Sequence, residues 1–449
     1  MLVNFRFGNY LSYNELAEFS MVSGGTRRHP KHVMKFKDVS LLKFAAIYGA
    51  NASGKSNLVK AIGFSKNLVV KGFKNTITSD KYCKIFPSNK EELTHFEYEI
   101  VFNDIVYSYG FSINLFEKVV YREWLYSLEN NGEEEIFVKE LKGNEYEFRL
   151  NNQYLNFSDV EKSRLNVYLE DSKELMDSLF ITEINKNKKP FLDRNNLSIF
   201  NLLYLWFETS LEVISPDESP AETGITYLRK DKGIALSNFL DAFGTGVKEV
   251  CTKDIHEKDL YNEMPSRIVK KILEQIREGD ADATHALLRT PHNIHEIEEK
   301  NGDVSIKTVY FKHSSEDVFY SLGEESDGTV RLVEIYDILA SNNQKVFVVD
   351  EIDRSLHPNL TYNFIKSYLQ KKNKGQLIVT THEDRLLDLE MLRRDEVWFV
   401  EKQEGGDSKL YSLENFKERF DRDILRAYLE GRYGSIPQFK VFNDLESRE

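Results

Sequence analysis

Cysteine and long apolar runs are both scarce in this chain of 449 residues. Its two cysteines, Cys83 and Cys251, lie far apart, which excludes a disulfide framework and favours a reducing cytoplasm. No apolar run approaches the roughly 20 residues that a membrane-spanning helix needs. No N-terminal stretch combines a basic start, an apolar centre and a small-residue cleavage site. We therefore expect a cytoplasmic protein with no membrane partner.

Positive charge is also in deficit, because 60 lysines and arginines face 73 aspartates and glutamates, for a net charge of −13. This balance disfavours a whole-surface, non-specific DNA binder, although it allows local basic patches. Two basic stretches occur, at residues 26–37 and 66–84. A solvated rim is the favoured interpretation of both. Contact with a nucleic-acid backbone or an acidic partner is the alternative.

What the chain does have is a phosphate-binding loop pattern, Gly-x-x-x-x-Gly-Lys-Ser, beginning at Gly49. An apolar run at 41–47 predicts a buried strand before it, and the spacing at 57–62 predicts a helix after it. Glycines let the backbone approach phosphate oxygens, and the helix start offers unpaired N–H groups. The alternative is a chance glycine turn. The expected nucleotide contacts are Gly49, Asn51, Ala52, Ser53, Gly54, Lys55, Ser56 and Asn57.

In this pattern Lys55 contacts the β- and γ-phosphates, and the Ser56 hydroxyl is a ligand of Mg²⁺. A second part of the site is predicted at 345–351, where an apolar, β-branched run ends in Asp350 and Glu351. Such a run is typical of a central parallel strand, whose C-terminal end lies where α/β sheets place ligands. Asp350 fits the acid that holds Mg²⁺, and Glu351 fits the group that orients the attacking water. The alternative is an ordinary strand followed by a helix cap.

Two further segments carry candidate residues. The run at 376–382 is another apolar strand with a polar end, and it places His382 where a side chain reaches the γ-phosphate. Before the Asp350 strand, Ser326 and Gly328 precede a predicted helix and form a second candidate anion site. A plain helix N-cap is the alternative for this site. A second phosphate site within one chain is useful if it closes over the nucleotide of another subunit.

The remaining chain divides by its periodicity. Residues 96–126 alternate between apolar and polar, which predicts an antiparallel meander with one wet face. From about 155 to 310 the spacing turns helical, and the lack of sustained heptads excludes a long coiled coil. The chain is too long for one compact core, so two lobes, or a core with an insertion, are expected.

These motifs, in this order, resemble the ABC-type ATPase heads of the RecF and SMC kind. The resemblance implies an α/β P-loop head: a mixed sheet with an antiparallel β-subdomain and a mainly helical insertion. The implied domains are an ATPase lobe with Walker A at 1–154, the insertion at 155–310, and a lobe with signature, Walker B, D-loop and switch histidine at 311–449. Two departures stand out. The signature reads Ser326–Asp327–Gly328–Thr329 instead of Ser-Gly-Gly-Gln, and the usual glutamine loop is missing, with His95 the candidate replacement.

A narrower resemblance is to the bacterial AbiLi/RloA-type ATPases, and in build to the ATPase AriA of the PARIS anti-phage system. It rests on the segments 49–57, 241–247, 350–353, 392–400 and 428–437. The resemblance implies ATP and Mg²⁺ as cofactors, a homo-oligomer with ATP between heads, a separate nuclease or toxin as effector, and a phage-encoded trigger. Few residues follow His382, too few for an appended Toprim nuclease. Arg393, Arg394 and Arg432 are either subunit contacts or core-edge ion pairs.

Three hypotheses about function follow. The first is an ABC-type ATPase that oligomerises around ATP and acts as sensor or scaffold in abortive infection, with Glu351 and His382 as catalytic residues. The second is a RecF-like DNA-maintenance ATPase that grips duplex through its basic stretches. The third is an ATP-binding scaffold with negligible turnover.

Overall fold

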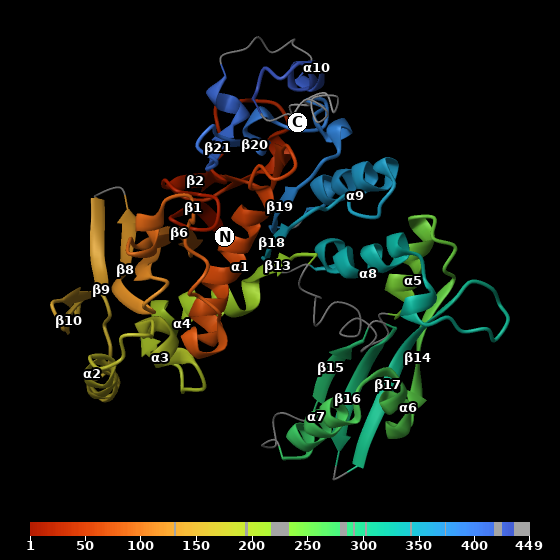
Figure 1. Cartoon of the computed structure of the whole chain (residues 1–449), viewed down its shortest axis with the longest axis horizontal. Helices are drawn as coiled ribbons and strands as arrows, with labels where there is room; N and C mark the ends of the chain where they lie inside the picture. The colour runs from red at the N-terminus through yellow and green to blue at the C-terminus, as the bar shows by residue number, and fades with distance from the viewer. Residues whose placement is uncertain are drawn as a thin grey trace, which may run out of the picture. The chain divides into compact units, whose positions relative to one another are not determined.

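The computed structural model describes residues 1–129, 132–193, 196–216, 233–278, 285–290, 292–300, 303–341, 344–372, 374–416 and 424–434. The chain divides into two compact units. Figure 1 colours the chain by residue number, so the segments of each unit can be found in it. Unit 1 comprises Met1–Ser215, Asn342–Ile352 and Leu369–Glu449, and unit 2 comprises Pro216–Ser341 and Asp353–Tyr368. Both therefore contain segments that are distant in sequence.

A six-stranded sheet forms the centre of unit 1, in the order β13-β18-β19-β5-β20-β21. Its strands are β5 (Phe44–Gly49), β13 (Leu211–Ile214), β18 (Val346–Val349), β19 (Gln376–Thr380), β20 (Val397–Lys402) and β21 (Ser408–Ser412). All neighbours are parallel except the last pair, β20 and β21. Strands β5, β18 and β19 are buried throughout, as expected for parallel strands covered on both faces.

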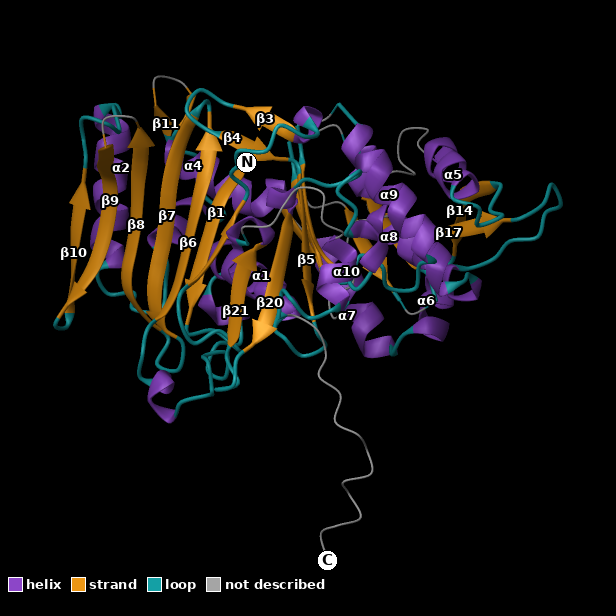
Figure 2. Ribbon diagram, turned by 90° about the horizontal axis from the view of Figure 1, so that it is seen from above, coloured by secondary structure: helices purple, strands orange, loops and turns teal. Residues whose placement is uncertain are grey.

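The second sheet of unit 1 is antiparallel and has the order β10-β9-β8-β7-β6-β1-β2; Figure 2 shows most of its strands side by side. Its strands are β1 (Leu2–Gly8), β2 (Ala17–Ser20), β6 (Thr94–Phe102), β7 (Ile105–Asn114), β8 (Val119–Glu129), β9 (Gly132–Lys142) and β10 (Glu145–Leu150). Alternation along β6 buries Phe96 and Tyr98 in the core and turns Glu97 to the opposite face. The predicted meander is confirmed.

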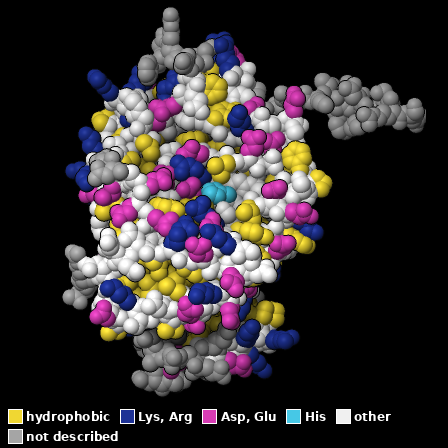
Figure 3. All heavy atoms as spheres, turned by 90° about the vertical axis from the view of Figure 1, so that its left-hand side faces the viewer, with side chains coloured by type: hydrophobic (Ala, Val, Ile, Leu, Met, Phe, Trp, Pro, Cys, Tyr) yellow, Lys and Arg dark blue, Asp and Glu magenta, His cyan; other side chains and the backbone are white. Residues whose placement is uncertain are grey.

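The polar face of this sheet carries cross-strand ion pairs. Arg149 of β10 lies 3.0 Å from Glu135 of β9, and Lys142 lies 2.6 Å from Glu147. Figure 3, which looks onto the side nearest β9 and β10, shows acidic and basic side chains interspersed. Exposed pairs of this kind each contribute at most about 1 kcal/mol to the free energy of unfolding. This face is therefore a solvated surface and not a second hydrophobic core.

The helices of unit 1 cover the inner faces of its sheets. They are α1 (Lys55–Lys71), α2 (Asp159–Ser172), α3 (Phe180–Asn185), α4 (Ile199–Leu205) and α10 (Ile424–Leu429); short strands are β3 (Val33–Lys35), β4 (Ser40–Leu42), β11 (Leu192–Asp193) and β12 (Asn196–Leu197). Helix α1 belongs to one continuous apolar core with both sheets, and Ser65 Oγ lies 2.6 Å from Tyr98 Oη. The phosphate-loop helix is therefore fixed along its length.

Unit 2 has a four-stranded antiparallel sheet in the order β14-β17-β16-β15. Its elements are β14 (Glu249–Ile255), β15 (His285–Arg289), β16 (Ile294–Lys300), β17 (Asp303–Lys312), α5 (Gly233–Ala242), α6 (Glu257–Glu263), α7 (Ser266–Glu278), α8 (Asp327–Ala340) and most of α9 (Pro358–Gln370). A small core of Leu260, Val269, Leu273 and Ile297 joins α6 and α7 to this sheet.

The structure differs from the predicted insertion in two ways. The segment 155–310 was expected to be mainly helical, but it also contributes β14, β15, β16 and part of β17. Within it, Leu211–Ile214 forms strand β13 and not helix, because it pairs in parallel with Val346–Val349. Short apolar runs of this length are ambiguous in sequence, and long-range pairing decides them. The predicted domain limits also differ from the observed units, since α2, α3 and α4 belong to unit 1 and α8 to unit 2.

Helix length agrees with the expectation of no long coiled coil. The longest helix in the described part of the chain is α1, with 17 residues. None of the described helices is long and apolar enough to cross a membrane.

Candidate nucleotide-binding site

The phosphate loop connects β5 to α1, as its pattern predicts. Gly49 ends the strand, Lys55 begins the helix, and Asn51 and Ala52 are exposed at the loop tip between them. The Lys55 side chain is buried, and its Nζ donates to the carbonyl oxygens of Gly49 (2.8 Å) and Ala50 (3.2 Å). These bonds hold the ammonium group at the loop, and phosphate oxygens are stronger acceptors for it than carbonyl oxygens.

Two glycines of the loop are required by their surroundings. A Cβ at Gly49 would overlap the Val400 carbonyl oxygen and lie 2.6 Å from Ser53 Oγ. Gly54 has φ +115° and caps the start of α1, and a Cβ there would overlap the hydroxyl of Ser408. The loop can adopt this tight path only without these side chains. The cradle therefore fits close approach of a phosphate group to the backbone.

The back of the loop is held by serines that sequence analysis did not identify. Ser408 Oγ of β21 donates to the Ser53 carbonyl oxygen (2.5 Å) and lies 2.7 Å from Ser12 Oγ. Asn57 Nδ2 donates to Ser12 Oγ (2.7 Å), and Tyr13 Oη donates to the Gly54 carbonyl oxygen (3.2 Å). These bonds bring segments from both ends of the chain against one loop, and no local pattern could have indicated them.

The acidic pair lies at the same edge of the sheet as the phosphate loop. Strand β19 separates β18 from β5, and all three run parallel, so their C-terminal ends coincide. Thr380 Oγ1 donates to Asp350 Oδ1 (2.5 Å) and accepts from the Glu351 backbone N–H (2.8 Å). Asp350 is 3% exposed, and Glu351 has a left-handed φ of +51°. Thr380, missed in the sequence, positions both acids.

His382 lies in the loop that follows β19, where its side chain is exposed. The preceding Thr381 backbone N–H donates to the Ile47 carbonyl oxygen (3.2 Å), which holds this loop beside the end of β5. His95 is different: its Nδ1 lies 3.3 Å from Ser112 Oγ, and it belongs to the sheet face opposite the one that packs on α1. His95 therefore does not replace the missing glutamine.

The second candidate anion site lies in unit 2. Ser326 is the N-cap of α8, and its Oγ accepts from the Thr329 backbone N–H at 3.1 Å. Ser326 is exposed and Gly328 is half-buried. The structure thus gives Ser326 the capping role that was the alternative interpretation. That role leaves the exposed helix start open to an anion, but the helix start alone does not identify one.

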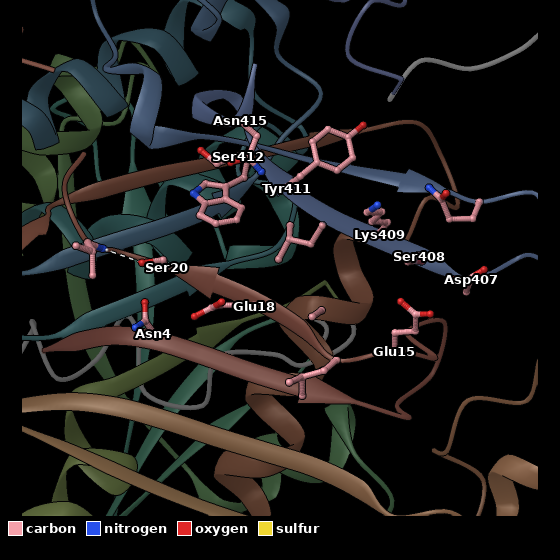
Figure 4. A pocket seen from close by; sticks show the side chains of 16 residues that line it. Asn4, Glu15, Glu18, Ser20, Asp407, Ser408, Lys409, Tyr411, Ser412 and Asn415 are labelled. Atoms are coloured by element: carbon pink, nitrogen blue, oxygen red, sulfur yellow. Dashed lines mark hydrogen bonds between the residues drawn. The ribbon is translucent and has the colours of Figure 1, made fainter. Parts of the chain in front are cut away.

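A separate cavity lies away from this site. About 770 Å³ lies between β2 and β21, and Figure 4 shows Glu15 and Glu18 on one side and Lys409 and Tyr411 on the other. Its lining includes Ser408 but neither Lys55 nor Asp350. The loop edge is therefore the candidate nucleotide site, because the glycine-rich backbone and the acids lie there.

Comparison with known proteins agrees with this geometry. The family described as "AAA domain, putative AbiEii toxin, Type IV TA system" (AAA_21) matches residues 44–388, from β5 to beyond the switch loop. The chain belongs to the AAA_21 family. No curated protein matches it. The predicted fold, a P-loop ATPase head with a mixed sheet and an antiparallel subdomain, is confirmed.

Among solved structures, the chain is similar to SMC heads. One is the SMC head bound to the C-winged helix domain of ScpA, with 13% identity, 92% of this chain and 98% of that chain covered, and a TM-score of 0.38. The SMC head from Thermotoga maritima has 12% identity, the same two coverages and a TM-score of 0.32. The Pyrococcus furiosus SMC head, with an extended coiled coil and bound ScpA domain, has 15% identity, coverages of 92% and 97%, and a TM-score of 0.31.

The oxygen-bearing side chains at the candidate nucleotide site fit Mg²⁺. In the described part of the chain no group of three or more His, Cys, Asp or Glu side chains could hold a metal ion by itself. Ser56 and Asp350 offer a hydroxyl and a carboxylate, and Mg²⁺ is commonly bound by one or two such oxygens together with substrate phosphates.

The C-terminal arginines of this AAA_21 chain have distinct surroundings. Arg393 is buried and pairs with Asp395 at 2.5 Å, and Arg394 donates to the Phe416 carbonyl oxygen at 2.9 Å. Arg432 is exposed and pairs with Glu430 at 2.9 Å. The first two are core-edge contacts. Arg432 pairs within its own chain at the surface.

Proposed function

We propose that this AAA_21 protein is an ABC-type ATPase whose copies assemble around ATP and control a separate toxic effector during phage infection. The observation that carries the ATPase part is the convergence of the phosphate loop with Asp350 and Thr380 at one edge of a parallel sheet. ATP-binding sites at the C-terminal edge of such sheets use loops and acids in this arrangement.

Each residue has a separate task in the proposed reaction. Lys55 and the start of α1 hold the phosphates, and Ser56 and Asp350 hold Mg²⁺, which neutralises charge on the phosphate oxygens when bound. Glu351 accepts a hydrogen bond from the attacking water and takes its proton as the oxygen bonds to the γ-phosphorus. The bond from that phosphorus to the bridging oxygen breaks, and ADP leaves with the electron pair. His382 contacts the γ-phosphate and makes the state of the switch loop depend on it.

The proposed assembly around ATP uses the second candidate anion site. Ser326 is the exposed N-cap of α8 and Gly328 lies in its first turn, and in the proposed assembly both contact the γ-phosphate held by a neighbouring copy. ATP then forms part of the interface, so binding and hydrolysis change the oligomeric state. A homo-oligomer of heads is the expected active form.

The defence role is supported by the family description, which names a putative toxin of a type IV toxin–antitoxin system. The proposed partners are a nuclease or other toxin, released or activated on contact with a phage-encoded trigger. In this proposal the chain acts like AriA of the PARIS system, which it resembles in build. The chain itself supplies the ATP-dependent sensor or scaffold.

The deciding experiment measures phosphate release and oligomeric state together, with purified protein, Mg²⁺ and ATP. We expect turnover together with ATP-dependent association. The proposed effector, if it is encoded by an adjacent gene, is added in a second measurement. Association without phosphate release in both measurements would leave only the hypothesis of an ATP-binding scaffold. Phage plating on cells with and without the locus tests the defence role, and equal plating would contradict it.

DNA binding is the second candidate, favoured by the exposed side chains of Arg27, Arg28 and Lys31 in one loop. A RecF-like ATPase would bind duplex with an affinity that falls steeply with salt. Charge reversal at these three positions would then weaken binding. We expect no salt-dependent DNA binding by the isolated protein, and such binding, lost on charge reversal, would favour the alternative.

A further inference from the structure

Three arginines of unit 2 surround one carboxylate, that of Glu334 in α8. Arg289 Nη2 of β15 lies 2.8 Å from Glu334 Oε1, and Arg331 Nη1 lies 3.1 Å from Oε2. The third arginine is Arg354, in the loop after Glu351, and its Nη2 lies 3.5 Å from Glu334 Oε2. The three guanidinium groups thus share the Glu334 carboxylate, and Arg354 is the most distant of them.

Arg354 also differs from the other two in exposure. Its side chain is 39% exposed, against 19% for Arg289 and 2% for Arg331. The two closer arginines already contact both oxygens of Glu334, so Arg354, the most distant and most exposed of the three, makes the weakest of these pairs. The Arg354 guanidinium can therefore leave this carboxylate at low cost when a stronger anion is offered.

The loop that carries Arg354 is packed against the proposed second phosphate site. A Cβ at Gly328 would lie 3.1 Å from the Ser355 carbonyl oxygen, so the two backbones are in close contact. Ser355 itself has a left-handed φ of +59°, a conformation that is rare for residues other than glycine and is found where function fixes the backbone. Arg354 is thus held next to the start of α8, where Ser326 is exposed.

We propose that Arg354 is an arginine finger that acts across the interface between two copies of this chain. In the assembled state it leaves Glu334 and contacts the γ-phosphate held by the neighbouring copy, where it stabilises the charge that develops as the γ-phosphoryl group transfers to water. Glu334 holds the finger in place in the separate chain. This inference rests on the proposed function, because it needs ATP between copies, and it adds a catalytic role for one side chain of the loop that follows Glu351.

Complementation between two inactive variants tests the inference. Glu351→Gln lacks the residue that orients water, and Arg354→Ala lacks the finger, but both keep the phosphate loop. The variants are mixed before nucleotide is added, and phosphate release is compared with that of each variant alone. If Arg354 acts across the interface, a mixed pair has one complete site: Glu351 from the Arg354→Ala copy and Arg354 from the Glu351→Gln copy.

We expect each variant alone to turn over at least about a hundredfold more slowly than the wild type, and the mixture to exceed their sum about tenfold or more. Arg289→Ala is the matched control, because it removes another partner of Glu334 without removing the finger, and its turnover should stay near that of the wild type. Arg354→Lys keeps a charge beside Glu334, so it should fold normally, with an unchanged melting temperature, and still turn over slowly.

The outcomes separate the two proposals. A mixture no faster than the sum of its components, with an active wild type, overturns the finger and leaves the ATPase intact. Wild-type turnover in Arg354→Lys and Arg354→Ala also overturns it. A wild type with neither turnover nor ATP-dependent association overturns both proposals.

Discussion

Glu351 is the residue on which the chemical step depends in the proposed reaction. Its backbone is held by Thr380 and its φ is left-handed, so its side chain direction is set by the turn after β18. Glu351→Gln should bind ATP with near wild-type affinity but hydrolyse it roughly 10²- to 10⁴-fold more slowly, because the amide cannot take the proton of water. Phosphate release and ATP binding are measured on the same sample. Unchanged hydrolysis would remove Glu351 from this role.

Gly49 tests the shape of the phosphate loop. In Gly49→Ala the new Cβ would overlap the Val400 carbonyl oxygen, so the loop must shift. We expect loss of ATP binding and a fall of about 1–3 kcal/mol in the free energy of unfolding, the usual cost of overpacking. Gly25→Ala is the control, since nothing lies within 4 Å of its added Cβ. Equal ATP affinities for the two variants would contradict the observed loop geometry.

For single residues, the sequence predicts those side chains whose role can be recognised from a local sequence motif. Lys55, Ser56 and Asp350 follow from the spacing of two motifs and from the apolar strands before them. Ser12 and Ser408 do not, because they are 396 positions apart and meet only in the folded chain. Serine is common in loops, and nothing nearby distinguishes these two.

The serine pair behind the phosphate loop acts at the level of strands, because it joins β21 to the loop. In Ser408→Ala the Ser53 carbonyl oxygen and the Ser12 hydroxyl lose a partner. A buried group left without its partner costs about 1–3 kcal/mol. We expect lower thermal stability and weaker ATP binding, measured by scanning and titration calorimetry. The exposed Ser163→Ala in α2 should change neither. If Ser408→Ala binds ATP like the wild type, β21 does not support the loop.

Glu97, on the wet face of β6, gives the antiparallel sheet a pH-dependent contribution. Burial acts to raise its pKa, but hydrogen bonds from His95 and Ser108 and the charge of Arg6 outweigh this effect and hold the pKa at about 2. The unfolded chain has a glutamate pKa of about 4.3. Because the folded pKa is the lower one, the stabilisation is present above about pH 4.3 and is lost as pH falls toward 2.

Urea unfolding of the wild type and Glu97→Gln checks this sign. The difference in free energy of unfolding should shrink as the pH falls below the unfolded pKa of the glutamate. A difference that persists unchanged at pH 3 would show that the charge of Glu97 does not stabilise the sheet.

Strands and helices were predictable to different extents. The buried strands β5, β18 and β19 stand out as apolar runs with polar ends, and β6, β7 and β8 as alternating runs. Strand β13 lies where the spacing predicts helix. Its four residues form a strand because they pair with β18, which lies more than a hundred positions away. The sheet of unit 2 was missed for a similar reason: β14 pairs with β17, with α6, α7 and two strands between them.

For the whole chain, the motifs predicted a divided P-loop head but not its boundaries. Unit 2 is formed by 216–341 together with 353–368, so the chain leaves unit 1 and returns to it twice. Contacts between distant segments define such units, and composition changes gradually along the chain. The proposed ATP-dependent assembly and the finger Arg354 both belong to this scale, since each needs a second copy.

The most direct measurement is titration calorimetry of the full chain with ATP, in the presence and absence of Mg²⁺, for the wild type and Lys55→Ala. If the loop and the acidic pair form one Mg²⁺-dependent site, the wild type binds ATP, removal of Mg²⁺ weakens binding, and Lys55→Ala abolishes it. Absence of heat with the wild type, or binding that persists unchanged in Lys55→Ala, would contradict a nucleotide site at this edge of the sheet.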